Sequence, residues 1–256
     1  MDANLSQIEN RYAVCVGIDN FKNPDQIASL KFAEANAKAM DSLLGKMGFE
    51  PKNRRLVVGE IASFEAIKAT LTTFGAVKPK ANDLVIFYYA GYFLDIQIEE
   101  DEGTIVLASY DLDLEEIRKN PEYRLQKTLR LGMLREIFEY SKSTNVLFIF
   151  DTCLGGDYEL SESSLQVTLN FVFANQHPGR VVVSSCLPQE EYNKSEGNLG
   201  LFAGHLVSAL EGQTEEAKNP EGNLTVGTLY KYLLKIMPHE YRPIQSSPEL
   251  DKLILA

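Results

Sequence analysis

The sequence contains no tryptophan, only three cysteines, and no apolar stretch long enough to cross a membrane. Cys15, Cys153 and Cys186 lie far apart, so they form neither the disulfide framework of a small secreted protein nor a CxxC metal pair. A membrane-spanning helix needs about 20 consecutive apolar residues. The first residues also lack the basic and apolar regions of a signal peptide. We therefore expect a cytoplasmic protein with reduced thiols and no membrane segment.

Basic residues are also scarce. The 25 Lys and Arg residues are outnumbered by 36 Asp and Glu residues, which gives a formal net charge of −11. No run of Lys or Arg interrupts this excess, so binding to nucleic acid or to an anionic membrane is not expected. The sequence also has neither a Walker loop nor a dinucleotide-binding fingerprint. We expect no partner among nucleic acids, membranes or nucleotide cofactors.

What the chain has is enough apolar sequence for a substantial core: 45% of its 256 residues are hydrophobic. We expect one domain over residues 1–256. Continuous apolar runs predict buried strands at 12–19, 55–58, 83–89, 145–150 and 180–185. Helical periodicity or capping signals predict helices at 31–47, 64–74, 129–140, 201–211 and 226–237. Strands alternating with helices predict an α/β fold, in which a parallel sheet lies between two layers of helices.

Two further segments are expected to extend the sheet. Alternation between Leu94 and Leu112 predicts a β-hairpin with the acidic tip Glu99–Gly103, and the C-terminal "SSPELDKLILA" predicts an edge strand. The acidic tip is also a candidate site for Ca²⁺. Its spacing does not match an EF-hand loop, which favours a solvated tip. We therefore expect no cofactor, with Ca²⁺ as the alternative.

Tyr92 and Cys153 each follow a predicted strand, and ligands of parallel sheets bind beyond the carboxyl ends of the strands. A cysteine in the glycine-rich segment "DTCLGG" suits a nucleophile, whose reactive form is the thiolate. A buried cysteine that only packs in the core is the alternative. Cys186 follows the next strand and could form a redox pair with Cys153, although two free thiols are favoured in a reducing compartment.

Six segments together resemble the caspase-like peptidases, and most closely the bacterial metacaspase-type members, also called orthocaspases. They are "YAVCVGIDNF", "FYYAGYFLD", "LASYDLD", "VLFIFDTCLGG", "RVVVSSC" and "GNLTVGTLYKYL". The resemblance covers the chain from about Arg11 onward. It implies a three-layer α/β/α sandwich with a mostly parallel, six-stranded sheet. It also implies a large-subunit-like part at about 11–157 and a small-subunit-like part at about 178–256.

The resemblance assigns the nucleophile position to Cys153 and places Tyr92 where the family has its histidine base. Gly91, Phe93 and Leu154 occupy the turn and oxyanion positions around these two residues, and Phe93 is expected to add bulk where the family has glycine. A phenol has a pKa of about 10 and stays protonated at neutral pH, whereas an imidazole titrates near pH 6.5. Loss of a triad-type base lowers the rate by about 10³- to 10⁶-fold. These departures predict a pseudopeptidase.

Another histidine could supply the missing base, and the chain has three. His205 falls within an apolar helical pattern, which favours a packing role, and His239 follows a proline at a predicted helix end. His177 lies in a segment without a clear pattern after the nucleophile strand. It is the histidine with the most freedom to approach Cys153, and it keeps an active enzyme open as an alternative.

The resemblance also implies a pocket for a basic side chain in Arg- or Lys-specific members. Asp151 matches one of its acidic residues. The second acidic position holds Gln189, with Glu190 directly after it, so this preference is expected to be weakened.

The sequence therefore predicts a caspase-like pseudopeptidase that acts as a regulatory or peptide-binding scaffold, with a protein or peptide as partner. Two alternatives stay open. One is a cysteine endopeptidase that cleaves after Arg or Lys with Cys153 as nucleophile, and the other is a redox sensor based on that thiol. We expect a monomer rather than a dimer, as in metacaspase-type relatives.

Overall fold

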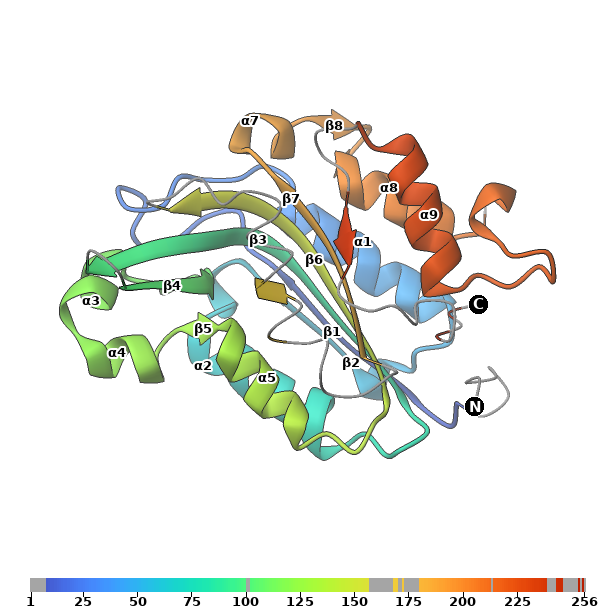
Figure 1. Cartoon of the computed structure of the whole chain (residues 1–256), viewed down its shortest axis with the longest axis horizontal. Helices are drawn as coiled ribbons and strands as arrows, with labels where there is room; N and C mark the ends of the chain where they lie inside the picture. The colour runs from blue at the N-terminus through green and yellow to red at the C-terminus, as the bar shows by residue number, and fades with distance from the viewer. Residues whose placement is uncertain are drawn as a thin grey trace.

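A computed structural model describes residues 8–99, 102–156, 168–169, 172, 180–212, 214–238, 243–245, 253 and 255. A curved sheet forms the middle layer, with helices on both faces (Figure 1). Its five longer strands are β1 (Arg11–Gly17), β2 (Arg54–Val58), β3 (Leu84–Glu99), β6 (Asn145–Gly156) and β7 (Arg180–Leu187). All four pairings among these strands are parallel. Residues of β1, β3 and β6 are buried in continuous runs, as expected for a sheet covered on both faces.

Three short strands complete this sheet. The order β10-β7-β6-β3-β1-β2 contains six strands, of which β10 (Ile244–Gln245) is antiparallel to β7. Beside the C-terminal part of β3, the strands β4 (Glu102–Leu107) and β5 (Leu129–Arg130) extend the sheet by antiparallel pairing. The predicted α/β/α sandwich with a mostly parallel sheet is confirmed, and β4 and β5 bring the sheet to eight strands.

The longer helices divide between the two faces. On one face lie α1 (Ala33–Lys46), α8 (Leu201–Leu210) and α9 (Val226–Ile236), and on the other lie α2 (Phe64–Leu71), its π-helical continuation η4 (Thr72–Val77) and α5 (Leu131–Glu139) (Figure 1). The remaining elements are η2 (Pro51–Asn53), η3 (Gly59–Ile61), α3 (Leu114–Lys119), α4 (Pro121–Gln126), α7 (Gln189–Tyr192), β8 (Ser195–Glu196), β9 (Leu199–Gly200) and η5 (Glu215–Ala217). Within the described part of the chain, no helix has both the length and the apolar character to cross a membrane.

Local signals in the sequence explain where several helices begin. The Ser63 hydroxyl accepts a hydrogen bond from the Ala66 amide at 3.3 Å and caps α2. Thr225 and Thr228 form a capping box at the start of α9. The helix α1 ends before Gly48, whose φ of +88° lies in the left-handed region that glycine tolerates. The predicted helices are therefore present, each within a few residues of its expected bounds.

Two predicted strands are much longer in the structure. β3 and β6 do not end before Tyr92 and Cys153 but stay paired from Leu84↔Asn145 to Asp95↔Gly156. The expectation that the two candidate residues lie beyond the strand ends is therefore wrong. Aromatic and branched residues favour an extended strand, whereas turn residues would end it. The segment "YFLDI" therefore continues β3 into the predicted hairpin with β4.

The described edge strand beside β7 is β10, which precedes the C-terminal "SSPELDKLILA" segment. The edge strand expected within that segment stays a prediction. Most of that segment falls outside the described residues, as do Glu100 and Asp101 at the tip of the hairpin.

Candidate active site at the Tyr92–Cys153 pair

The structure brings the two central candidates together. Tyr92 and Cys153 are direct partners in the parallel register of β3 and β6. The Cys153 side chain is fully buried and Tyr92 is only 5% exposed. The Tyr92 ring packs against the Phe21 ring, with 5.7 Å between the centroids. The thiol therefore lies beneath an aromatic cover.

The Tyr92 hydroxyl is a weak base in this position. Burial raises the pKa of Tyr92 well above its ordinary value of 10.0, and the charge of a Cys153 thiolate and a side-chain hydrogen bond with Cys153 raise it further. The phenol therefore stays protonated at neutral pH and cannot take a proton from the thiol. The thiol itself contacts the carbonyl oxygen of Leu154 at 3.6 Å. Of the three histidines, the structure describes only His205, which is half-buried on α8.

Asp151 lies two residues before the thiol and faces the interior. It is 2% exposed, and its Oδ2 accepts hydrogen bonds from the Tyr88 hydroxyl at 2.7 Å and from Asn36 Nδ2 at 2.9 Å. Burial raises the pKa of Asp151 to about 6, although these two hydrogen bonds lower it. The Oδ1 atom of Asn36 accepts a hydrogen bond from the Gly200 amide at 2.9 Å. Side chains of the protein itself therefore donate hydrogen bonds to the carboxylate that the resemblance assigns to a substrate pocket.

The other two residues of that predicted pocket lie on α7. Gln189 is half-buried and its Nε2 donates to the Ser29 carbonyl oxygen at 3.4 Å, whereas Glu190 is exposed. Because Asp151 is buried and Glu190 faces solvent, the described residues do not place the two carboxylates in one pocket.

The residues predicted for the turns lie in the paired strands instead. Gly91 is extended within β3, where a Cβ atom would lie 2.6 Å from the Tyr89 hydroxyl oxygen. Phe93 is fully buried and packs edge-on against Phe150 at 6.5 Å, on the face of the sheet opposite Tyr92. The expectation that Phe93 adds bulk where a glycine would leave space for a substrate backbone is therefore wrong, because strand alternation turns its side chain into the core. Leu154 is half-buried at the edge of a cavity.

That cavity opens beside Tyr92 and has a volume of about 490 Å³. Alternate residues of β3, namely Tyr92, Leu94 and Ile96, form one apolar wall. The other lining residues are Asp25, Gln26, Ile27, Ala28, Leu114, Glu115, Arg118, Leu154, Gly155, Gly156 and Gln189. An apolar wall with a few polar groups at the rim is typical of a ligand pocket.

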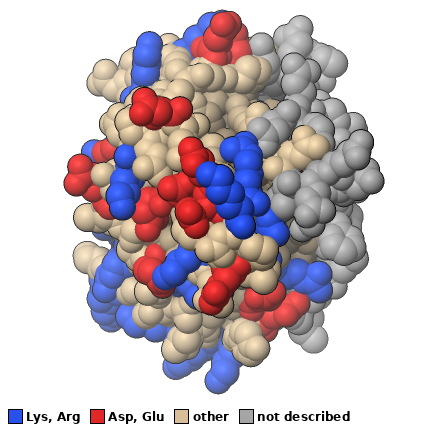
Figure 2. Space-filling model, turned by 90° about the vertical axis from the view of Figure 1, so that its left-hand side faces the viewer, with Lys and Arg blue, Asp and Glu red and all other residues tan. Residues whose placement is uncertain are grey.

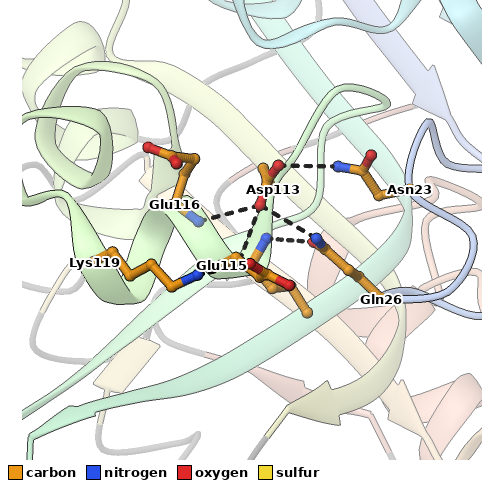
Figure 3. A network of polar contacts seen from close by, with 7 residues as sticks. Asn23, Gln26, Asp113, Glu115, Glu116 and Lys119 are labelled. Carbon is orange, nitrogen blue, oxygen red and sulfur yellow. Dashed lines mark hydrogen bonds and ion pairs between the residues drawn. The ribbon is translucent and has the colours of Figure 1, made fainter.

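A network of hydrogen bonds holds this rim in place (Figure 3). Asp113 caps α3, and its Oδ1 accepts from the amides of Glu115 at 2.9 Å and Glu116 at 3.1 Å. The same carboxylate accepts from Asn23 at 3.4 Å and Gln26 at 3.3 Å. The Gln26 Oε1 accepts in return from the amide after Asp113, at 2.7 Å. The loop after β1 is thereby fixed to α3. Sequence reasoning missed this contact, although Asp113 with Glu115 and Glu116 in the turn after it signals a helix start.

The surface around this rim carries both charges. On the face with α3 and α4, acidic and basic side chains are interspersed (Figure 2). Lys119, for example, pairs with Glu115 at 2.7 Å. No cluster of His, Cys, Asp or Glu suited to a metal ion occurs among the residues that the structure describes. The Ca²⁺ candidate at the hairpin tip involves residues outside that part, and it stays a prediction.

The second thiol of the predicted redox pair belongs to β7, the next strand. Cys186 lies beside Thr152 in the register of β6 and β7. Its side chain is outside the described part of the chain, so the redox pair stays a prediction.

Comparisons with known proteins agree with this architecture. The caspase domain family matches residues 10–250. The crystal structure of protein GSU0716 from Geobacter sulfurreducens is similar over 94% of this chain and 97% of that one, with a TM-score of 0.64 and 13% sequence identity. At that identity, the likeness concerns the fold. None of the curated proteins compared with the chain matches it in sequence. Because the family match spans nearly the whole sequence, this chain belongs to the caspase domain family.

Proposed function

We propose that this caspase-domain protein is a pseudopeptidase of metacaspase type, which binds a protein or peptide segment without cleaving it. The observation that carries the proposal is the position of Tyr92 directly opposite a fully buried Cys153. A cysteine peptidase needs a base that accepts the thiol proton and a thiol that a substrate carbonyl can reach. Tyr92 provides no such base, and it covers the thiol.

The surroundings of Asp151 support the same proposal. A pocket for Arg or Lys needs an accessible carboxylate, since an isolated buried charge is unfavourable and a bidentate ion pair requires close approach. Tyr88 and Asn36 already occupy Asp151 Oδ2. A peptide segment would instead bind in the cavity beside Tyr92, where the apolar wall suits a hydrophobic side chain.

The first test is a cleavage assay with purified protein on a peptide library that carries Arg, Lys or Asp at the cleaved position. It is run with and without Ca²⁺, beside the variants Cys153→Ala and Tyr92→His. We expect no turnover by the wild type. Turnover that disappears in Cys153→Ala would overturn the proposal and favour the active endopeptidase. Activity gained only by Tyr92→His would show that the site lacks a base and is otherwise intact.

A second test measures the reactivity of the thiol. An activated thiolate is alkylated rapidly below about pH 8, whereas an ordinary buried thiol reacts slowly. We expect slow alkylation of Cys153 by iodoacetamide at pH 7 and faster alkylation in Tyr92→Ala, quantified by mass spectrometry of the Cys153 peptide. The buried Cys15 is an internal control, since Tyr92→Ala should leave its rate unchanged. Rapid alkylation of Cys153 in the wild type would contradict the proposal.

A further inference from the structure

A second cavity lies on the face of the sheet opposite Cys153, along α2, η4 and α5. It has a volume of about 720 Å³, and we call it the helix groove. Its lining residues are Glu65, Lys68, Thr72, Ala76, Val77, Leu125, Gln126, Lys127, Arg130, Met133, Glu136, Ile137 and Tyr140. None of these residues belongs to the proposed peptide cavity beside Tyr92.

Large apolar side chains are unusually exposed along this groove. Val77 is 74% exposed, Leu125 is 58% exposed and Tyr140 is 83% exposed. Among the described residues, only one other large apolar side chain, Ile61, is comparably exposed. Exposed apolar side chains gathered around a groove mark interaction sites more often than chance, and tyrosine is frequent among the residues that contribute most to binding.

The shape of the groove suits a helix. α2 and η4 together line about 20 Å of it at about 1.5 Å per residue, which matches nearly four turns of a bound helix. Its floor contains the buried Ala76 and Met133. At Gly75 the Phe138 ring comes so close that a Cβ atom would lie 2.8 Å away, so η4 and α5 are packed tightly beneath the groove. η4 widens to a π-helical turn, with Lys78 N donating to Thr73 O at 3.0 Å, and such turns are frequent at functional sites.

The charges of the groove select the chemistry of its partner. The charges of Lys127 and Glu65 offset each other in an ion pair at 2.5 Å. The other charged lining residues are Lys68, Arg130 and Glu136, which together carry one net positive charge. The Nε atom of Arg130 is buried and has no hydrogen-bond partner, while its Nη2 donates to the Leu125 carbonyl oxygen at 3.1 Å. The groove thus has an excess of positive charge on a chain whose net charge is −11. Arg130 as a whole is only half-buried, so its positive charge lies at the groove, where a carboxylate of a bound partner complements it.

We propose that the helix groove binds an amphipathic helix of a partner protein, with an apolar stripe on Val77, Leu125 and Tyr140 and acidic residues facing Lys68 and Arg130. A second copy of this chain is a poorer occupant. A two-fold symmetric contact brings the same patch of each subunit together, which would oppose the cationic groups of the two copies. The proposal does not depend on whether Cys153 is catalytic.

The test uses two synthetic helical peptides of about 15 residues. They share one leucine stripe at i, i+3, i+4 and i+7 and differ only in flanking Glu or Lys residues. Fluorescence anisotropy should show that the Glu peptide binds the wild type about ten-fold more tightly than the Lys peptide at low salt. The difference should shrink as salt is added. The overall charge of the protein repels the Glu peptide, so this preference would have to arise locally.

Three variants locate the binding. Tyr140→Ala should weaken the Glu peptide about ten-fold without altering the fold, because the side chain is exposed. Lys68→Glu should abolish the preference for Glu, whereas Lys38→Glu on α1, which changes the net charge equally, should preserve it. Binding that is absent, insensitive to Tyr140→Ala or equal for the two peptides would overturn the proposal. A dimer in sedimentation that disappears in Tyr140→Ala would assign the groove to a second copy instead.

Discussion

The two halves of the β3–β6 strand pair are built from one continuous ladder but differ in content. From Leu84↔Asn145 to Tyr89↔Phe150 the ladder carries mostly aromatic and branched side chains, which interlock in the core. From Ala90↔Asp151 to Asp95↔Gly156 it carries a buried carboxylate, a thiol and three glycines. We call these the apolar half and the polar half. The apolar half matches what the caspase resemblance implies, and the polar half is where strands continue in place of turns.

The difference shows how a fold can persist while its site changes. The apolar half is held by packing between Phe87, Phe148 and Phe150, whose rings meet edge-on or stacked at 6.1 to 6.4 Å. Only Phe93 of the polar half joins this aromatic cluster, through its contact with Phe150 at 6.5 Å. In the polar half, Tyr92 and Phe93 favour the extended conformation, so β3 and β6 stay paired through the candidate site. The packing of the apolar half is unchanged by this extension. Four predictions can break or sharpen this contrast.

The largest expected effect lies in the apolar half. Phe148→Ala removes a fully buried ring that packs on Phe138 at 4.6 Å and on two neighbours in the sheet. It should lower the free energy of unfolding by about 3–5 kcal/mol. Tyr92→Ala is the matched change in the polar half and should cost less, because the Tyr92 ring borders an open cavity. Urea unfolding of both variants measures the two losses. Equal losses would contradict the contrast between the halves.

Asp151 lies at the boundary and should weaken the fold at neutral pH. Its pKa is raised from 3.8 to about 6, so between these values the folded protein holds a proton that the unfolded chain has released. The resulting contribution to stability is present below about pH 4 and is lost as the pH rises through 6. Asp151→Asn keeps an oxygen for Tyr88 and Asn36. It should be more stable than the wild type by up to about 3 kcal/mol at pH 7.5 and about equally stable at pH 4.

Thermal unfolding across this pH range measures the difference between the wild type and Asp151→Asn. Asp25→Asn, which removes an exposed carboxylate, controls for the loss of one charge. A difference between the wild type and Asp151→Asn that does not vary with pH would contradict the role assigned to burial.

The end of the polar half depends on one glycine. Gly156 has a φ of +115°, and a Cβ atom there would lie 2.0 Å from the Asp95 carbonyl oxygen. Gly156→Ala should cost roughly 1–3 kcal/mol and unpair the last residues of β6. Gly197→Ala has a φ of +73° but no atom within 4 Å of its Cβ, and should cost only about 1 kcal/mol. Hydrogen exchange of the Asp95 region should accelerate only in Gly156→Ala.

The smallest effect concerns one hydroxyl group between β3 and the segment after β4. The Tyr89 hydroxyl donates to the Ala108 carbonyl oxygen at 2.8 Å and lies 3.1 Å from that of Tyr92. The Tyr92 carbonyl also accepts from the Ala108 amide at 3.0 Å. Tyr89→Phe should therefore leave one carbonyl unsatisfied and cost about 1 kcal/mol in chemical denaturation. A loss as large as that of Phe148→Ala would show that this hydroxyl organises the polar half.

The sequence predicts the apolar half better than the polar half for a physical reason. Continuous apolar runs signal buried strands regardless of their neighbours, and the helices α1, α2 and α9 carry their own stripes or caps. The length of β3 and β6 beyond Tyr89 and Phe150 depends on the pairing of the two strands. Residues such as Tyr92 and Phe93 favour an extended chain, but they do not identify the partner strand. The pairing of Tyr92 with Cys153 follows from the resemblance. The enclosure of Asp151 by Tyr88 and Asn36 joins distant parts of the chain, so it required the structure.

Asn36 and the β6–β7 pairing connect parts of the molecule that lie on either side of the segment between Gly156 and Arg180. β6 and β7 are paired from Val146↔Arg180 to Cys153↔Leu187, and Asn36 bridges Asp151 and the Gly200 amide. A single nick between Gly156 and Arg180 would leave these contacts intact. The two fragments would remain associated as a noncovalent complex, and they would separate only when the whole sheet unfolds.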